Sequence, residues 1–137
     1  MSLDRFLDAQ DAGVFERALG ELQLGRKRSH WMWFILPQLR GLGHSETSRY
    51  YGLSRLAEAA DFLSHPVLGE RLLAVCDALA DWPHLGAEAV LGSVDAMKLR
   101  SCLTLFAAVP NAPPIFAGLL RSYFDGASCP NTLAAIR

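Results

Sequence analysis

The feature that most limits the fold of this chain is an apolar pattern with the period of an α-helix, which recurs along the sequence. Apolar residues at i, i+3, i+4 and i+7 place one continuous stripe on one side of a helix. This pattern predicts five helices, within residues 15–22, 53–60, 72–79, 99–106 and 116–123. Shorter helices are expected near 4–10 and 131–136. We therefore expect an all-α, compact multihelical fold of about six to eight helices, without a substantial sheet, in which residues 1–137 form one domain.

Residues that start or stop helices stand between these segments. Gly25 follows the first segment, Pro66 can open the third, and two prolines at 113–114 separate the last two. Ser93 or Asp95 can cap the helix that contains residues 99–106. The positions of these helix-starting and helix-stopping residues therefore agree with the helix boundaries that the apolar pattern predicts.

The segment Trp31–Leu36 departs from the amphipathic pattern because all six of its residues are apolar. Such a segment has no solvent face, so it belongs in the core or against a partner. Pro37 disfavours helix at Leu36. A strand here would lack a second alternating segment to pair with. We expect a buried helical turn that runs into an extended stretch.

Composition excludes several classes of protein. Of the 137 residues, 51% are hydrophobic and 20% charged, which is typical of a chain that folds by itself. The formal net charge of -1 makes binding of bulk nucleic acid unfavourable. The beginning of the sequence does not resemble a secretory signal, and no apolar stretch reaches the length of a membrane span. We expect a cytoplasmic protein without a membrane partner, and the sequence leaves its oligomeric state open.

The three cysteines, Cys76, Cys102 and Cys129, lack the CxxC spacing of metal-binding or redox motifs. An odd number of cysteines in a reducing compartment favours buried, inert thiols. The four histidines show no i, i+4 pairing, so the sequence predicts no metal site and no cofactor.

Cations, indoles and a histidine are concentrated in residues 25–33. Guanidinium and ammonium groups bind phosphate or carboxylate, indoles stack on planar rings, and histidine exchanges protons near neutral pH. The alternative is that the cations complement the end of the preceding helix while both indoles belong to the core. The candidate residues are Arg26, Lys27, Arg28, His30, Trp31 and Trp33.

Two further segments carry candidate residues. Asp95, Lys98 and Ser101 lie near the start of a predicted helix, where unpaired backbone N–H groups attract anions. Asp95 could instead cap the helix and pair with Lys98. Gly43 and His44 follow the aromatic segment, in a glycine-containing loop that permits close backbone approach. We assign His30 and Asp95 as candidate catalytic residues and the others as candidate ligand-binding residues.

The stretch from Gly25 to Gln38, followed by residues 41–43, resembles a chiefly bacterial family known as domain of unknown function 1810. The likeness continues over nearly the whole chain, at Phe6, residues 9–10, 21–22, 51–52, 58–59, 65–69, 71–72 and 91–92, at Asp95, and at residues 98–99 and 104–106. It departs at Leu36 and over residues 125–132. The resemblance implies a multihelical single domain. Some members carry the label calpastatin, but inhibitory calpastatin segments are disordered and repetitive, unlike this compact chain.

A fainter resemblance concerns helical N-glycosidases that act on ADP-ribose-linked compounds. It rests on a Lys/Trp-rich segment and a late helix with lysine followed by apolar residues. The first hypothesis is therefore that a small anionic, nucleotide-like ligand, such as ADP-ribose, binds between residues 26–33 and the helix near Asp95. Metal-free hydrolysis of an N-glycosidic bond is the reaction that this resemblance implies. The alternative is a non-enzymatic protein-interaction module that uses Trp31–Leu36.

Overall fold

The computed structural model describes residues 3–136, which form ten α-helices and one short 3-10 helix. The all-α class is confirmed, but the expected six to eight helices are too few. The elements are α1 (Asp4–Gln10), α2 (Val14–Gln23), α3 (Met32–Ile35), α4 (Glu46–Tyr51), α5 (Leu56–Ser64), α6 (Leu68–Leu79), η1 (Pro83–Leu85), α7 (Ala87–Leu91), α8 (Ser93–Ala107), α9 (Ile115–Phe124) and α10 (Pro130–Ile136).

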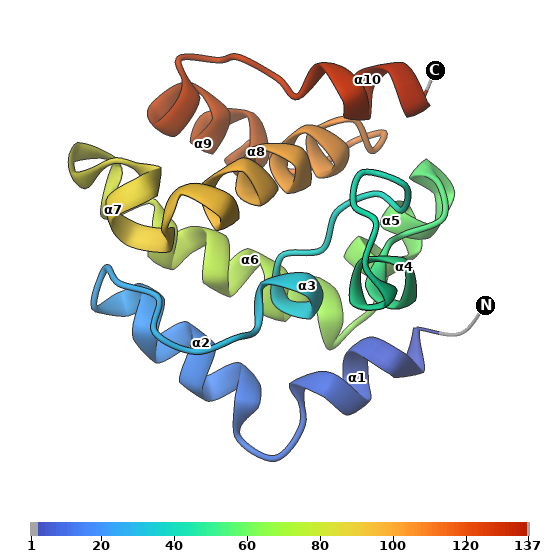
Figure 1. Cartoon of the computed structure of the whole chain (residues 1–137), viewed down its shortest axis with the longest axis horizontal. Helices are drawn as coiled ribbons and strands as arrows, with labels where there is room; N and C mark the ends of the chain where they lie inside the picture. Colours follow the sequence, from blue (N-terminus) through green and yellow to red (C-terminus); the bar gives the residue numbers. More distant parts are fainter. Residues whose placement is uncertain (1–2, 137) are drawn as a thin grey trace.

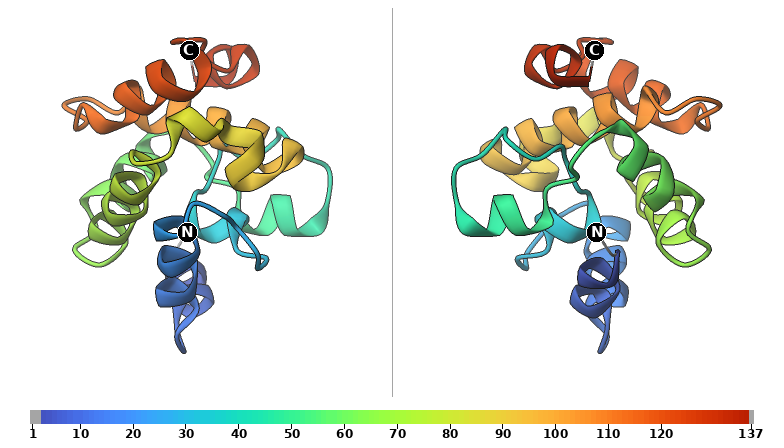
Figure 2. Two further views of the ribbon diagram at one scale, coloured as in Figure 1. Left: turned by 90° about the vertical axis from the view of Figure 1, so that its left-hand side faces the viewer. Right: turned by 90° about the vertical axis from the view of Figure 1, so that its right-hand side faces the viewer.

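The helices pack around α6, which contacts α2, α3, α5 and α9 (Figure 1). Helices α8, α9 and α10 gather on one side of α6, whereas α1 and α2 lie on the other. Figure 2 shows that α4 lies across the molecule from α6, beyond α3. Within residues 3–136, no helix combines the length and the apolarity that crossing a membrane would require.

The aromatic segment forms the predicted helical turn, α3, followed by extended backbone. A parallel bridge joins Leu39 to Leu53, with hydrogen bonds from Arg40 N to Leu53 O (2.7 Å) and from Leu53 N to Gln38 O (3.0 Å). Trp31 and Leu36 are fully buried at the two ends of the apolar run. The expected turn and extended stretch are therefore confirmed, and the segment runs through the core.

Two predicted helix starts are wrong. Leu53 lies outside its helix, because it belongs to the bridge and α5 begins at Leu56. The predicted side-chain cap of α8 is absent among the described residues: Gly92, at φ +87°, occupies the cap position. Asp95 instead pairs with two lysines, as described below.

The stretch His65–Gly69 has a structural role at the junction of α5 and α6. His65 Nδ1 accepts hydrogen bonds from Val67 N (3.1 Å) and Leu68 N (3.2 Å), which satisfies backbone donors at the start of α6. Gly69 is buried against α5, and a Cβ atom there would overlap the carbonyl oxygen of Leu63. His65 and Gly69 therefore allow α5 and α6 to meet in a close junction.

A buried ion pair joins α1 to α5, and a hydrogen bond from the same arginine joins α1 to α4. Arg5 Nη2 lies 3.3 Å from Glu58 Oε1, and Arg5 Nε donates to Tyr50 O at 2.8 Å. Glu58 Oε1 also accepts from Ser54 N at 2.8 Å. Burial alone would raise the pKa of Glu58, but its hydrogen bonds with Ser54 and the charge of Arg5 lower it. The carboxylate is therefore ionised and satisfied in the folded state.

Candidate functional site

A single carboxylate holds the segment that contains the predicted cations. Glu21, near the end of α2, accepts hydrogen bonds from Arg28 N (2.7 Å), Ser29 N (2.9 Å), Ser29 Oγ (2.5 Å) and Trp31 Nε1 (2.9 Å). Burial alone would raise the pKa of Glu21, but these hydrogen bonds lower it to about 2. The chain can turn sharply before this segment because Gly25 has φ +75°, and its Cα faces the ring of Trp82. Glu21 thus shapes the loop between α2 and α3.

Lys27 connects this loop to α8. Its backbone N donates to Val90 O at 2.8 Å, and its Nζ lies 2.9 Å from Asp95 Oδ2. Lys98 Nζ lies 3.2 Å from the other carboxylate oxygen of Asp95. Burial opposes ionisation of Asp95, but hydrogen bonds and charge attraction from Lys27 and Lys98 lower its pKa. The three side chains form an ion cluster with a formal charge of +1, one carboxylate between two ammonium groups.

Each lysine of the ion cluster also lies over an indole ring. Lys27 Nζ is 5.1 Å from the ring centroid of Trp31, and Lys98 Nζ is 4.0 Å from that of Trp33. Trp31 is buried and its N–H is bonded to Glu21, whereas Trp33 is only partly buried. Cation–π attraction therefore orients both ammonium groups, and Trp33 keeps an accessible ring surface.

Two neighbouring cavities open beside the ion cluster. The first cavity, of 310 Å³, is lined by Lys27, His30, Trp31, Met32, Trp33, Phe34, Thr47, Asp95 and Lys98. The second cavity, of 270 Å³, is lined by Trp33, Gln38, Leu42, Gly43, Val94, Met97, Lys98, Arg100, Ser101, Cys129 and Asn131. Trp33 and Lys98 contribute to both, so they form the wall that the two cavities share.

Most of the predicted site residues meet at these cavities. Six of them line the first cavity: Lys27, His30, Trp31, Trp33, Asp95 and Lys98. Gly43 and Ser101 line the second. A Cβ at Gly43 would lie 3.0 Å from the Ser48 side chain and 3.6 Å from the Trp33 ring, so the loop backbone packs closely there. The two segments between which a ligand was predicted to bind are therefore adjacent, while binding itself stays a prediction.

Three predicted residues line neither cavity. Arg26 and Arg28 are exposed, and their backbone N–H groups bond to Glu21, at its carbonyl and its carboxylate respectively. His44 is also exposed, and its carbonyl accepts a hydrogen bond from Arg49 Nη1 at 2.7 Å. Their side chains are separated from the ion cluster because the loop turns them toward solvent.

Sequence reasoning missed three residues of the site. Glu21 lies outside the dense motif, although it is an acid placed just before a run of donors. Gln38 and Cys129 line the second cavity. The predicted burial of the thiols is confirmed for Cys76 and Cys102, where burial raises the pKa, to about 12 for Cys76. Cys129 departs from that prediction because it is only half-buried.

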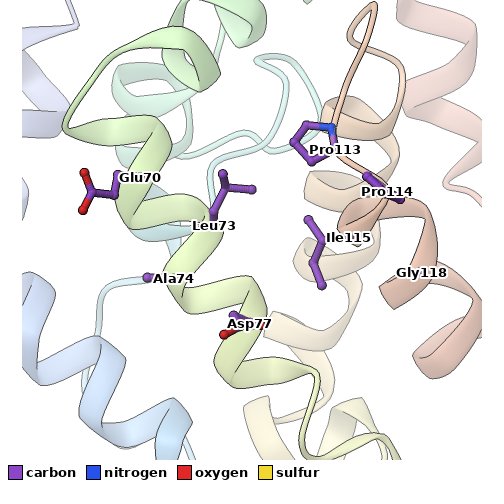
Figure 3. Close-up of a pocket in the computed structure, with 8 residues that line it drawn as sticks. All are labelled: Glu70, Leu73, Ala74, Asp77, Pro113, Pro114, Ile115 and Gly118. Atoms are coloured by element: carbon purple, nitrogen blue, oxygen red, sulfur yellow. The ribbon is translucent and has the colours of Figure 1, made fainter.

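A cavity of 700 Å³ lies away from this site, between α6 and α9 (Figure 3). In Figure 3, Leu73 and Ile115 approach each other across it, and two prolines close one end. Its ionisable lining residues are the acids Glu70 and Asp77. An apolar cavity bordered by acids does not suit an anionic ligand. The first and second cavities therefore remain the candidate site, although each has a smaller volume than this one.

The interaction-module alternative requires an exposed aromatic segment. The structure instead buries Trp31, Met32, Ile35 and Leu36, each with at most 3% of its surface exposed. The segment is therefore partly core and partly cavity wall, with only Trp33 and Phe34 partly exposed.

Within residues 3–136, no group of three or more His, Cys, Asp or Glu side chains is arranged to hold a metal ion.

Comparison with known proteins decides the family. The family model described as "Protein of unknown function (DUF1810)" matches residues 1–136. The chain belongs to this family. A crystal structure of the conserved hypothetical protein Rv1873 from Mycobacterium tuberculosis is similar to it, with 42% identity and a TM-score of 0.94 over 98% of this chain and 95% of that one. No curated protein matches the chain. The DUF1810 fold is thus shared with a solved structure.

Proposed function

We propose that this DUF1810 domain binds a small anionic ligand with a planar ring at the first cavity. The observation that carries the proposal is the ion cluster, in which Lys27 and Lys98 flank Asp95 while each ammonium lies over an indole. Two cations provide charge-assisted contacts for a phosphate, and the accessible ring of Trp33 offers a stacking surface. A nucleotide-like compound such as ADP-ribose combines both chemistries.

The adjoining second cavity supports a ligand larger than one ring. Trp33 and Lys98 border both cavities, so a ligand that stacks on Trp33 can extend to either side of it. Arg100 adds a further cation to the lining of the second cavity. Binding displaces part of the Asp95 contacts from the lysines, because a phosphate competes with that carboxylate for the same ammonium groups.

The finer proposal is that the site hydrolyses an N-glycosidic bond with side chains alone. Water would bond to the anomeric carbon, and the carbon–nitrogen bond would break with its electron pair going to the base. The proton lost by that water would pass to a neutral leaving base or, when the base is the cationic nicotinamide of NAD, to solvent. Asp95 suits a charged role, because its lowered pKa keeps it ionised at neutral pH. A carboxylate stabilises the positive charge that develops on the sugar, or orients the water. His30, in the same cavity, would carry the proton.

Thermal unfolding with added ligand tests the binding proposal. At one hundred times its dissociation constant, a ligand stabilises the folded state by about 2.7 kcal/mol, which raises the melting temperature by several degrees. We expect this shift with ADP-ribose, NAD or a nucleotide, and its loss in Lys98→Met. Arg28→Met is the matched control, because it also removes a cation but from an exposed position outside the cavity.

The outcomes of this experiment are separable. Loss of the shift in Lys98→Met with an intact shift in Arg28→Met supports the first cavity, provided that both unliganded variants unfold like the wild type. Equal loss in both variants would indicate diffuse charge attraction and contradict the proposed site. No shift with any of these compounds, nor with inorganic phosphate, would overturn the proposal.

Substitution Asp95→Asn separates binding from hydrolysis. The substitution leaves both lysines without their carboxylate, so phosphate-containing ligands should bind at least as tightly as they do to the wild type. Release of nicotinamide from NAD or nicotinamide mononucleotide, followed by chromatography, should fall at least about 100-fold, since charge stabilisation at the sugar is lost. If the wild type releases no base, hydrolysis is refuted while binding stands on the thermal measurement.

A further inference from the structure

The second cavity contains a thiol whose position is fixed by α8. Cys129 N donates to Thr104 Oγ1 at 2.9 Å, and Ser101 Oγ lies 3.4 Å from Cys129 Sγ. Arg100 donates to the two preceding carbonyls, Ala127 O and Ser128 O, at 2.7 Å each. Because all four contacts are made by residues of one helix, the loop before α10 presents the sulfur to the cavity in a defined place.

A mostly buried amide also lines the second cavity. Gln38 has only 8% of its surface exposed, and within residues 3–136 its side chain forms no hydrogen bond, so its amide atoms meet the solvent of the cavity. A polar molecule that enters the cavity beside Cys129 can replace this solvent and bond to the amide.

The lining of the second cavity favours a negatively charged molecule. Lys98 and Arg100 both line it, whereas no Asp or Glu does. Asp95, which lines the first cavity, pairs with Lys98 and offsets its positive charge. Arg100 therefore supplies the net positive charge of the second cavity. The remaining walls are mainly apolar or aromatic, and the volume of 270 Å³ is slightly below the usual range of small-molecule sites, so it suits a small ligand or part of a larger one.

The environment of Cys129 also favours its reactive form. Burial alone would raise the pKa of this thiol, but hydrogen bonds from the Ser101 hydroxyl and from the backbone at the start of α10 lower it. Cys76 and Cys102 have no such donors and are fully buried in the core. Of the three thiols, Cys129 alone combines access to a cavity with stabilisation of the thiolate.

We propose that Cys129 is a modification site, which forms a mixed disulfide with small anionic disulfides that enter the second cavity. The Cys129 thiolate attacks one sulfur of the incoming disulfide. That sulfur–sulfur bond breaks, a new one to Cys129 forms, and the other half leaves as a thiolate that takes a proton from water. One disulfide is consumed and one is formed, so no further oxidant is needed. Gln38 and Arg100 hold the polar groups of the bound half.

Intact-mass spectrometry of the full chain tests this proposal with two disulfides of opposite charge. We expect one adduct per chain, absent from Cys129→Ser, with glutathione disulfide, which is anionic. The cationic disulfide cystamine should react at least about tenfold more slowly, after each rate is divided by that of N-acetylcysteinamide, a thiol without net charge, with the same reagent. This normalisation removes the intrinsic reactivity of the reagents.

Two serine variants provide the matched comparison. Ser101 and Ser122 each bond to the carbonyl one helical turn earlier, at 3.3 and 3.0 Å, but only Ser101 contacts Cys129. Ser101→Ala should slow adduct formation several-fold, while Ser122→Ala should leave it unchanged. Reaction of Cys129 no faster than that of N-acetylcysteinamide, or a preference for cystamine, would overturn the proposal. Equal effects of the two serine variants would do the same.

Discussion

Substitution Gly69→Ala is expected to lower the free energy of unfolding by about 3 kcal/mol. The added Cβ atom would overlap the carbonyl oxygen of Leu63, a backbone atom that no side-chain rotation can move. Relief requires α5 and α6 to separate, and overpacking of this kind costs about 1–3 kcal/mol, with more where the backbone must shift. Urea unfolding would show the change as a lower midpoint with an unchanged slope.

The matched control for this prediction is Gly20→Ala in α2. Gly20 is also a helical glycine, but nothing lies within 4 Å of the Cβ that the substitution adds. Alanine is the better helix former, so this variant should gain roughly 0.5–1 kcal/mol. Opposite signs for the two variants would support a close junction at Gly69. A gain for both would contradict it, because helix propensity alone would then account for the results.

The helices that could be predicted are those with a sustained apolar stripe. Helices α2, α6, α8 and α9 each contain the segment that the periodicity indicated. Helices α4 and α7 were missed because they have only six and five residues, too few for a repeat of the pattern. Helix α4 begins instead with a polar signal, since Ser45 Oγ accepts from Ser48 N at 3.1 Å.

The candidate site was predictable in part because its residues are unusually dense in the sequence. A cluster of cations and indoles within one loop pointed to the first cavity, and an acid followed by lysine pointed to α8. Local sequence could not show which cations face inward. Lys27 and Arg28 are adjacent, yet only Lys27 reaches Asp95, since Glu21 holds the backbone of Arg28 and leaves its side chain in solvent. Which of the two side chains faces the cavity depends on the hydrogen bond to Glu21, seven positions before Arg28, and on the contact of Lys27 with α8.

The hydrogen bonds of Glu21 predict a pH-dependent contribution to stability. The pKa of Glu21 is lowered in the folded state to about 2, from the ordinary value of 4.5. A lowered folded-state pKa means that the stabilisation is fully present above pH 4.5 and is lost as the pH falls from there toward 2. Because the side chain is half-buried and screened by solvent, we expect this contribution to be about 1–2 kcal/mol.

Substitution Glu21→Gln should therefore destabilise the protein by about 1–2 kcal/mol at neutral pH, because the amide lacks the charge that strengthens these hydrogen bonds. The difference from the wild type should shrink as the pH is lowered below 4.5, because the Glu21 carboxyl of the unfolded wild type takes up a proton there, whereas that of the folded protein does so only near pH 2. Chemical unfolding at a series of pH values measures this difference directly. A difference that stays constant with pH would mean that the charge of Glu21 is not what stabilises the loop.

The control for Glu21 is Glu16→Gln, an equivalent change on the exposed part of the same helix, which should alter stability by less than about 0.5 kcal/mol. Glu21→Gln should also have an effect that Glu16→Gln lacks. Trp31 Nε1 and the backbone of residues 28–29 bond to Glu21, so weakening them loosens the loop that carries Lys27 to Asp95. Ligand affinity at the first cavity should fall in Glu21→Gln although Glu21 does not line that cavity, because part of the binding energy must then order the loop.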